Sequence, residues 1–134
     1  MILIVDDDPE FLDLAETDLS VATKGCFRAS NATQAVNLIQ KIGSEVGVAL
    51  VDLRMPGVSG FELIRSLHQI DSTLPIIAIS GVVSDKALES ALGLGATETL
   101  RKPITGAWND AIRRVRRKRS DEAPPEAAPP VRLT

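Results

Sequence analysis

The sequence predicts an α/β protein built on a doubly wound, five-stranded parallel sheet, and three observations predict this class. Short apolar runs alternate with longer amphipathic stretches, which is the pattern of successive βαβ units. Four of the five apolar runs are continuous or nearly so, as expected of strands buried on both faces of a parallel sheet. Strict alternation of strands and helices also implies right-handed crossovers between the parallel strands.

The five expected strands are short, and the second is the weakest of them. Its first residue, Cys26, is predicted to be a small core residue rather than a reactive thiol. The strands are expected at Ile2–Val5, Cys26–Ala29, Val48–Val51, Ile76–Ile79 and Thr97–Leu100.

Capping residues and apolar stripes place the first two helices between these strands. Asp8 is predicted as an N-cap, with Pro9 at the first helical position. Asn31 opens the second helix and Gly43 closes it. The apolar stripes are Phe11, Ala15 and Leu19 in the first helix, and Ala35, Val36, Ile39 and Ile42 in the second.

The other three helices are expected at Gly60–Ile70, Asp85–Leu94 and Thr105–Lys118. In the last of them Trp108, Ile112 and Val115 mark one buried face, so Trp108 is most simply a core residue. His68 is the one histidine, and we interpret it as a surface or boundary residue rather than a phosphohistidine.

Length and composition indicate one domain with a short tail. The chain has 134 residues, of which 44% are hydrophobic, with a mean hydropathy of +0.09. One cysteine cannot form an internal disulfide, and no run approaches about 18 apolar residues, so a cytoplasmic location without a membrane segment is expected. The segment EAPPEAAPP holds four of the eight prolines, which predicts a folded domain over 1–118 and a Pro-rich, disordered tail over 119–134.

The charges are unevenly distributed. Seven acidic residues and no basic ones fall within the first 18 positions, and six of the seven residues from Arg113 to Arg119 are basic. We interpret the basic run as a solvated helix end that the helix dipole favours. Contact with nucleic acid is the alternative, but three phenylalanines, one tryptophan and no tyrosine supply no stacking platform. DNA binding by this chain alone is therefore not expected.

Polar residues gather where the expected strands end. Asp6-Asp7-Asp8 follows the first strand, Asp52 the third, Ser80 the fourth, and Lys102 lies just beyond the fifth. Ligands of doubly wound sheets bind beyond the carboxyl ends of the strands, near the point where the strand order reverses. Any single aspartate there is most simply a polar residue at a strand end, but a crowded set of carboxylates is costly unless a cation lies among them.

Mg²⁺ is the cation that this set predicts, because it prefers carboxylates, water and phosphate oxygens. A softer metal is not expected, since the lone cysteine and the lone histidine are not clustered. A hard cation, a hydroxyl and an ammonium group around one carboxylate are typical of phosphoryl transfer. Asp52 is then the nucleophile, which attacks phosphorus in line and forms an acyl phosphate.

Four segments together resemble one known family. ILIVDDDPE, LVDLRMPGVSGFEL, IIAISG and LRKPI, in this order and spacing, are similar to the receiver domain of two-component response regulators. The resemblance extends from Met1 to about Lys118. It implies the flavodoxin-like (βα)5 fold with strand order 2-1-3-4-5, in which Met55-Pro56-Gly57 and Gly60 form the turn after the acceptor strand.

The resemblance also implies roles for the residues at the strand ends. Asp7 binds Mg²⁺ directly and Asp6 largely through water, while Asp52 is both phospho-acceptor and metal ligand. The backbone carbonyl of Arg54 is a further metal ligand. Ser80 is the hydroxyl that turns toward the phosphoryl group. Lys102 is its ammonium partner, oriented by a Lys102–Pro103 bond that is cis in the family.

A receiver domain implies particular partners. The phosphoryl donor is a sensor histidine kinase or a histidine phosphotransfer protein, and the domain catalyses its own phosphorylation and dephosphorylation rather than acting on a separate substrate. The output face comprises Asp85–Leu94, Thr97–Leu100 and Thr105–Lys118, which contact a downstream protein or a second copy. Thr99 departs from the family, because many receivers have an aromatic residue three positions before the lysine.

Three alternatives compete with this interpretation. A phosphatase of the haloacid-dehalogenase type would use Asp6 as nucleophile and Asp8 as acid–base, but no acidic metal motif follows Lys102 and Asp52 would have no role. A pseudo-receiver that acts only as a binding module has no need of the acidic cluster. The chain is also compatible with a fragment of a longer regulator or hybrid kinase, although a single-domain regulator is the simplest expectation.

Overall fold

The computed structural model describes residues 1–20, 25–81, 84–102 and 107–117. The predictions made for Pro103, Thr105, Lys118 and the tail over 119–134 fall on residues outside these ranges. Within them, no helix combines the length and the apolar character needed to cross a membrane.

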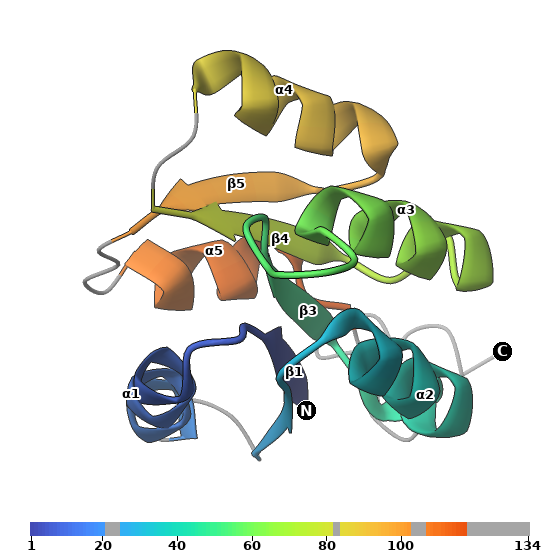
Figure 1. The fold of residues 1–134 in the computed structure, drawn as a ribbon. Helices are drawn as coiled ribbons and strands as arrows, with labels where there is room; N and C mark the ends of the chain where they lie inside the picture. The colour runs from blue at the N-terminus through green and yellow to red at the C-terminus, as the bar shows by residue number, and fades with distance from the viewer. Residues whose placement is uncertain (21–24, 82–83, 103–106, 118–134) are drawn as a thin grey trace, which may run out of the picture.

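Strands and helices alternate through the described residues as predicted (Figure 1). The sheet has five strands in the order β2-β1-β3-β4-β5, and every neighbouring pair is parallel, which confirms the predicted fold class and strand order. A short 3-10 helix, η1, follows α2. The elements are β1 Ile2–Val5, α1 Pro9–Ser20, β2 Cys26–Ala29, α2 Ala32–Ile42, η1 Gly43–Glu45, β3 Val48–Asp52, α3 Gly60–Ile70, β4 Ile76–Ser80, α4 Asp85–Leu94, β5 Glu98–Arg101 and α5 Ala107–Val115.

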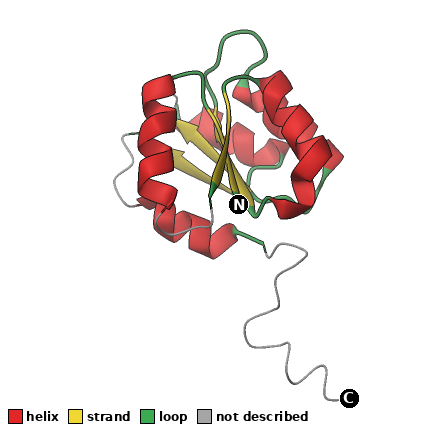
Figure 2. Cartoon of the chain, turned by 90° about the horizontal axis from the view of Figure 1, so that it is seen from below, coloured by secondary structure: helices red, strands yellow, loops and turns green. Residues whose placement is uncertain are grey.

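The sheet separates two helical layers. Helices α1 and α5 cover one face, and α2, α3 and α4 cover the other (Figures 1 and 2). Successive strand residues point to opposite faces, so Leu3 and Val5 pack under α2 and α3 while Ile4 packs under α1 and α5. All residues of β1, β3 and β4 are buried, which explains why these runs are continuous rather than alternating.

Side-chain caps begin the helices where the sequence predicts. Asp8 Oδ1 accepts a hydrogen bond of 3.0 Å from Glu10 N, and Asn31 Oδ1 accepts one of 2.9 Å from Gln34 N. The helix α2 ends at Ile42 as expected, but Gly43 has a φ of −54° and continues into η1. The left-handed glycine cap is instead at the end of α4, where Gly95 has a φ of +129°.

The last strand and helix differ from their predicted bounds. Strand β5 covers Glu98–Arg101, because Thr97 lies just before the ladder, where its hydroxyl accepts a hydrogen bond of 3.3 Å from Ile76 N. Helix α5 ends at Val115, three residues earlier than predicted. Trp108 and Ile112 are buried and Val115 packs against the same core cluster, which confirms the predicted buried face.

Two residues that the sequence raised as possible reactive groups have structural roles. His68 is exposed on α3, and its ring lies so close to Gly95 that a Cβ there would come within 2.7 Å of it. Cys26 is half-buried and packs against the core cluster under α1 and α5.

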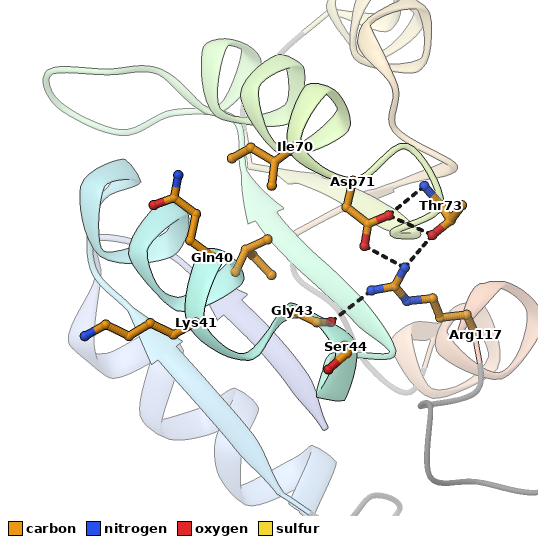
Figure 3. Close-up of a pocket in the computed structure, with 9 residues that line it drawn as sticks. Gln40, Lys41, Gly43, Ser44, Ile70, Asp71, Thr73 and Arg117 are labelled. Atoms are coloured by element: carbon orange, nitrogen blue, oxygen red, sulfur yellow. Dashed lines mark hydrogen bonds and ion pairs between the residues drawn. The ribbon is translucent and has the colours of Figure 1, made fainter.

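Arginines of the basic run form ion pairs within the fold, which differs from the prediction of a simply solvated helix end. Arg114 pairs with Glu98 of β5 at 2.7 Å. Arg117 pairs with Asp71 at 2.8 Å and donates to the backbone carbonyl of Gly43 at 2.9 Å (Figure 3). Although burial opposes it, hydrogen bonds from Thr73 and Arg117 hold the pKa of the Asp71 carboxyl below its usual range. Arg117 therefore joins α5 to the segments before β3 and β4.

The connection from β3 to α3 depends on one glycine. Gly60 N donates to the Leu53 carbonyl at 3.2 Å, and a Cβ on Gly60 would lie 2.1 Å from the Asp52 backbone oxygen. The start of α3 can approach the end of β3 this closely only without a side chain. Gly57, in the preceding turn, has a φ of +76°, the left-handed conformation that glycine adopts readily.

We expect Gly60→Ala to destabilise the fold by more than about 2 kcal/mol, because backbone atoms rather than a flexible side chain would have to move. Gly93→Ala is the matched control, since it lies within α4 and a Cβ there meets nothing within 4 Å. We expect that change to stabilise the protein by about 0.5–1 kcal/mol through helix propensity. Urea unfolding measures both, and equal effects of the two substitutions would contradict this account of Gly60.

Candidate functional site

The strand register brings the predicted site residues to one edge of the sheet. Val5 of β1 pairs with Val51 of β3, so Asp6 and Asp52 leave the ladder side by side. Asp52 pairs with Ile79, which places Ser80 one residue further along β4. Strand order reverses between β1 and β3, which is where doubly wound sheets bind their ligands.

Three carboxylates gather at this edge. Asp6, Asp7 and Asp52 each offer one oxygen, and these oxygens all lie within 4.8 Å of one another. Asp6 is 1% exposed and Asp52 6% exposed, while Asp7 lies on the surface. The cluster therefore has two buried carboxylates and one that faces solvent, an arrangement that could hold a hard cation.

Backbone groups orient both buried carboxylates. Asp8 N donates to Asp6 Oδ1 at 2.9 Å, and Arg54 N donates to Asp52 Oδ1 at 3.2 Å. In each case the donor is two residues beyond the aspartate, so the turn that follows the strand holds the side chain.

Lys102 follows β5, the edge strand that lies two places from β3, and its side chain reaches back to the cluster. Its backbone N donates to the Ser80 carbonyl at 2.8 Å, which extends the β4–β5 ladder by one bond. Its ammonium lies 2.7 Å from Asp6 Oδ2 and 3.9 Å from Asp52 Oδ2. The lysine ammonium thus forms a hydrogen bond with Asp6, whereas its distance to Asp52 is too long for one.

Ser80 ends β4 and is fully buried. In the described part of the chain its Oγ has no hydrogen-bond partner. A buried hydroxyl without a hydrogen-bond partner costs free energy, so such a group is unusual at the end of a well-packed strand. The group is suited to donate to an oxygen that arrives from outside the protein.

Electrostatics separate Asp52 from an ordinary carboxyl. Burial, together with the charges of Asp6 and Asp7, raises the pKa of Asp52 from 3.8 to about 6, against the opposing effects of the Arg54 N–H and of Lys102. Without a cation, the folded protein therefore binds the Asp52 proton more tightly than the unfolded chain does.

The structure brings the side chains of Asp6, Asp7, Asp52 and Lys102 together, and it adds two contacts that the sequence did not predict. The ring of Phe11 lies under the Lys102 ammonium, 4.0 Å from Nζ to the ring centroid. Gly60 contacts the Asp52 backbone. The sequence assigned Phe11 to the buried stripe of α1, and only its spacing of four residues from Asp7 could have signalled a place near the site.

Comparison with known proteins identifies the family. Residues 2–112 match the model of the response regulator receiver domain. The chain belongs to this family, as its sequence motifs predict.

Relatives with this domain differ greatly in length. The chain is 36% identical over 121 residues to the C4-dicarboxylate transport transcriptional regulatory protein DctD of Pseudomonas aeruginosa, covering 84% of this chain and 24% of that protein. It is 35% identical to the response regulator GtcR of Aneurinibacillus migulanus, over 77% of this chain and 41% of GtcR. It is 30% identical to the sensor histidine kinase RcsC of Escherichia coli, over 78% of this chain and 11% of RcsC. The chain thus spans less than half the length of each.

Solved structures agree with the fold. A CheY-like response regulator receiver domain protein from Methanospirillum hungatei matches with a TM-score of 0.79 and 26% identity, over 84% of this chain and 90% of that one. A response regulator receiver domain protein from Clostridium thermocellum matches with a TM-score of 0.76 and 28% identity, over 84% and 94%.

The pKa of Asp52 predicts a pH-dependent effect of its removal. Because the folded state holds this proton more tightly, the free energy of unfolding falls as the pH rises from about 4 to about 6. Metal-free Asp52→Asn has no proton to lose at this position, so we expect its free energy of unfolding not to fall in this way. The difference in the free energy of unfolding between Asp52→Asn and the wild type should therefore grow from the low to the high end of that window by on the order of 1–3 kcal/mol. Urea unfolding in chelator measures it. A gain for Asp52→Asn that is equal at both ends of the window would contradict the raised pKa.

Proposed function

We propose that this chain is the phospho-acceptor of a two-component pathway and receives a phosphoryl group on Asp52. One observation carries the proposal: a carboxylate of raised pKa lies with an acidic pair and 3.9 Å from a lysine ammonium. The neighbouring strand β4 ends in the buried Ser80 hydroxyl, which has no partner among the described residues. Each of these groups suits one part of a phosphoryl group, and family membership agrees with the assignment.

The transfer step uses few groups of the protein. A carboxylate oxygen of Asp52 attacks the phosphorus of a phosphohistidine, a P–O bond forms, and the P–N bond breaks with its electron pair going to the imidazole nitrogen. The Lys102 ammonium and the Ser80 hydroxyl donate to the phosphoryl oxygens. The domain thereby catalyses its own phosphorylation from the phosphohistidine donor and, with water as nucleophile, its own dephosphorylation, rather than modifying a separate substrate.

Mg²⁺ fits the acidic cluster. Three carboxylate oxygens within 4.8 Å of one another are a hard donor set, and Asp7 is exposed to solvent. We assign direct binding to Asp7 and Asp52, binding through water to Asp6, and a further ligand to the carbonyl of Arg54. When bound, the cation neutralises the negative charge that accumulates on the phosphoryl oxygens.

The contacts of Asp6 argue against the phosphatase alternative. One oxygen of Asp6 accepts from Asp8 N and the other from Lys102 Nζ, so each oxygen already accepts a hydrogen bond that makes it a weaker nucleophile. Asp8 Oδ1 caps α1 through Glu10 N rather than facing a leaving group. Asp52 Oδ2, in contrast, lies 3.9 Å from the lysine, beyond hydrogen-bond reach.

The proposed partners follow from the family. We assign phosphoryl donation to a sensor histidine kinase or a histidine phosphotransfer protein; RcsC, a relative, is by name such a kinase. The receiver occupies residues 1–118 in this proposal, with 119–134 as a separate tail, and it acts in the cytoplasm without binding DNA itself.

We further assign the output to the face formed by α4, β5 and α5, which contacts a downstream protein or a second copy. Ion pairs join its elements: Arg101 of β5 with Asp85 of α4, and Glu98 of β5 with Arg114 of α5. Because β5 leads directly into Lys102, a movement of the lysine can reach both helices.

Incubation with a small acyl- or amido-phosphate and Mg²⁺ should add one phosphoryl group that is labile to base and to hydroxylamine. We expect Asp52→Asn to abolish this labelling and Asp6→Asn only to weaken it, because Asp6 assists rather than attacks. Mass spectrometry of the intact chain and of its peptides gives the stoichiometry and the site. A label that maps to Asp6 would support the phosphatase mechanism instead.

Mg²⁺ should also stabilise the unphosphorylated fold by mass action, by about 2.7 kcal/mol at a hundred times Kd. Asp7→Asn should lose most of this effect because the direct ligand is removed, whereas Asp18→Asn on the exposed side of α1 should keep it. Thermal melts with and without millimolar Mg²⁺ measure the difference. An unchanged melting temperature in the wild type would count against the metal site.

A further inference from the structure

An aromatic pair connects the Lys102 ammonium to the last helix. Phe11, in the first turn of α1, lies beneath the ammonium with 4.0 Å between Nζ and the ring centroid. Phe11 also contacts Trp108 of α5, with 5.9 Å between the ring centroids and 58° between the ring planes. Trp108 is 1% exposed and belongs to the core under α1 and α5.

The ring restricts where the ammonium can lie. A cation is attracted to the face of an aromatic ring, and this attraction adds to the hydrogen bond with Asp6 at 2.7 Å. Together, the ring and Asp6 keep a long, flexible side chain at the edge of the cluster, 3.9 Å from Asp52 Oδ2. An aliphatic side chain of similar size would fill the space but would not attract the charge.

Helix α1 holds the ring rigidly in this place. The Asp8 cap and Pro9 begin the helix directly after the acidic pair, so Phe11 lies one turn from Asp7. The neighbouring residues Leu12 and Ala15 are buried in the core cluster between α1 and the sheet, and this fixes the rotation of the helix about its axis.

We propose that Phe11 is a positioning residue for the Lys102 ammonium and that, through Trp108, it couples the position of this ammonium to α5. The proposal rests on the role given above to Lys102. When Lys102 moves toward a phosphoryl group on Asp52, the ring loses its cation, and its packing against Trp108 changes. This contact supplies an aromatic route to α5 in a chain that has Thr99 at the usual aromatic position.

The first test uses the unphosphorylated protein, so it does not depend on phosphoryl transfer. Ring currents should shift the Lys102 methylene protons next to Nζ upfield in NMR spectra. Phe11→Leu should remove that shift, Phe11→Tyr should restore it, and the exposed control Leu14→Ala should leave it unchanged. If Phe11→Leu does not fold, Phe11→Met provides the same comparison. Lysine shifts that are the same in wild type and in the ringless variant would overturn the proposal.

The second test measures the consequence for the site. Phe11→Leu should slow phosphorylation by a small phosphodonor about five-fold, which is about 1 kcal/mol at 1.36 kcal/mol per factor of ten and is the size of a partly exposed cation–π contact. Phe11→Tyr should recover most of the rate. A rate equal to that of the wild type in Phe11→Leu would overturn the positioning role.

The third test follows the coupling through the one tryptophan of the chain. Beryllofluoride with Mg²⁺ should change Trp108 fluorescence in the wild type and in Thr99→Ala, and much less in Phe11→Leu. An equal response in Phe11→Leu, or no response in the wild type, would overturn the coupling to α5. A wild type that shows the lysine ring-current shift but accepts no phosphoryl group would instead overturn the proposed function and leave the ground-state contact in place.

Discussion

The parallel register between β1 and β3 is the constraint on which the site depends. Because Val5 pairs with Val51, Asp6 and Asp52 must leave the sheet next to each other, and both are buried there. Burial takes both carboxylates out of water and their charges repel each other, which is why the pKa of Asp52 rises to about 6. The backbone N–H groups of Asp8 and Arg54 offset part of this cost.

Lys102 makes the surroundings of the two buried carboxylates different. Its ammonium is hydrogen-bonded to Asp6 at 2.7 Å and lies 3.9 Å from Asp52, so the negative charge of Asp6 is paired and that of Asp52 is paired less well. A carboxylate that attacks phosphorus is a better nucleophile when a charged donor does not already hold its lone pairs. The same lysine that stabilises the cluster therefore also distinguishes the acceptor from its neighbour, and the ring of Phe11 helps to hold it in that position.

The two ends of the sheet are held in different ways. Before β3 and β4, Arg117 joins Asp71, Thr73 and the carbonyl of Gly43 (Figure 3). Its Nε also donates to the carbonyl of Val46, so two segments share one side chain. At the carboxyl ends, the groups gathered around Asp52 include a hydroxyl without a partner among the described residues and carboxylates that repel each other. One side chain thus joins the segments before β3 and β4, whereas the opposite ends of these strands carry the polar groups of the candidate site.

The sequence by itself determined the fold class, the strand order through its family resemblance, and which polar residues follow which strands. These properties depend on local patterns: continuous apolar runs, the Asn31 cap, and an aspartate directly after β1. Only the tertiary structure decided which groups touch. Lys102 bonds to Asp6 across a separation of 96 residues, and Phe11 faces its ammonium rather than only the core. Arg117 binds four residues in the segments before β3 and β4 rather than being simply solvated. Contacts of this kind depend on how the helices pack on the sheet, because side chains distant in sequence meet only after the register and the layers are in place.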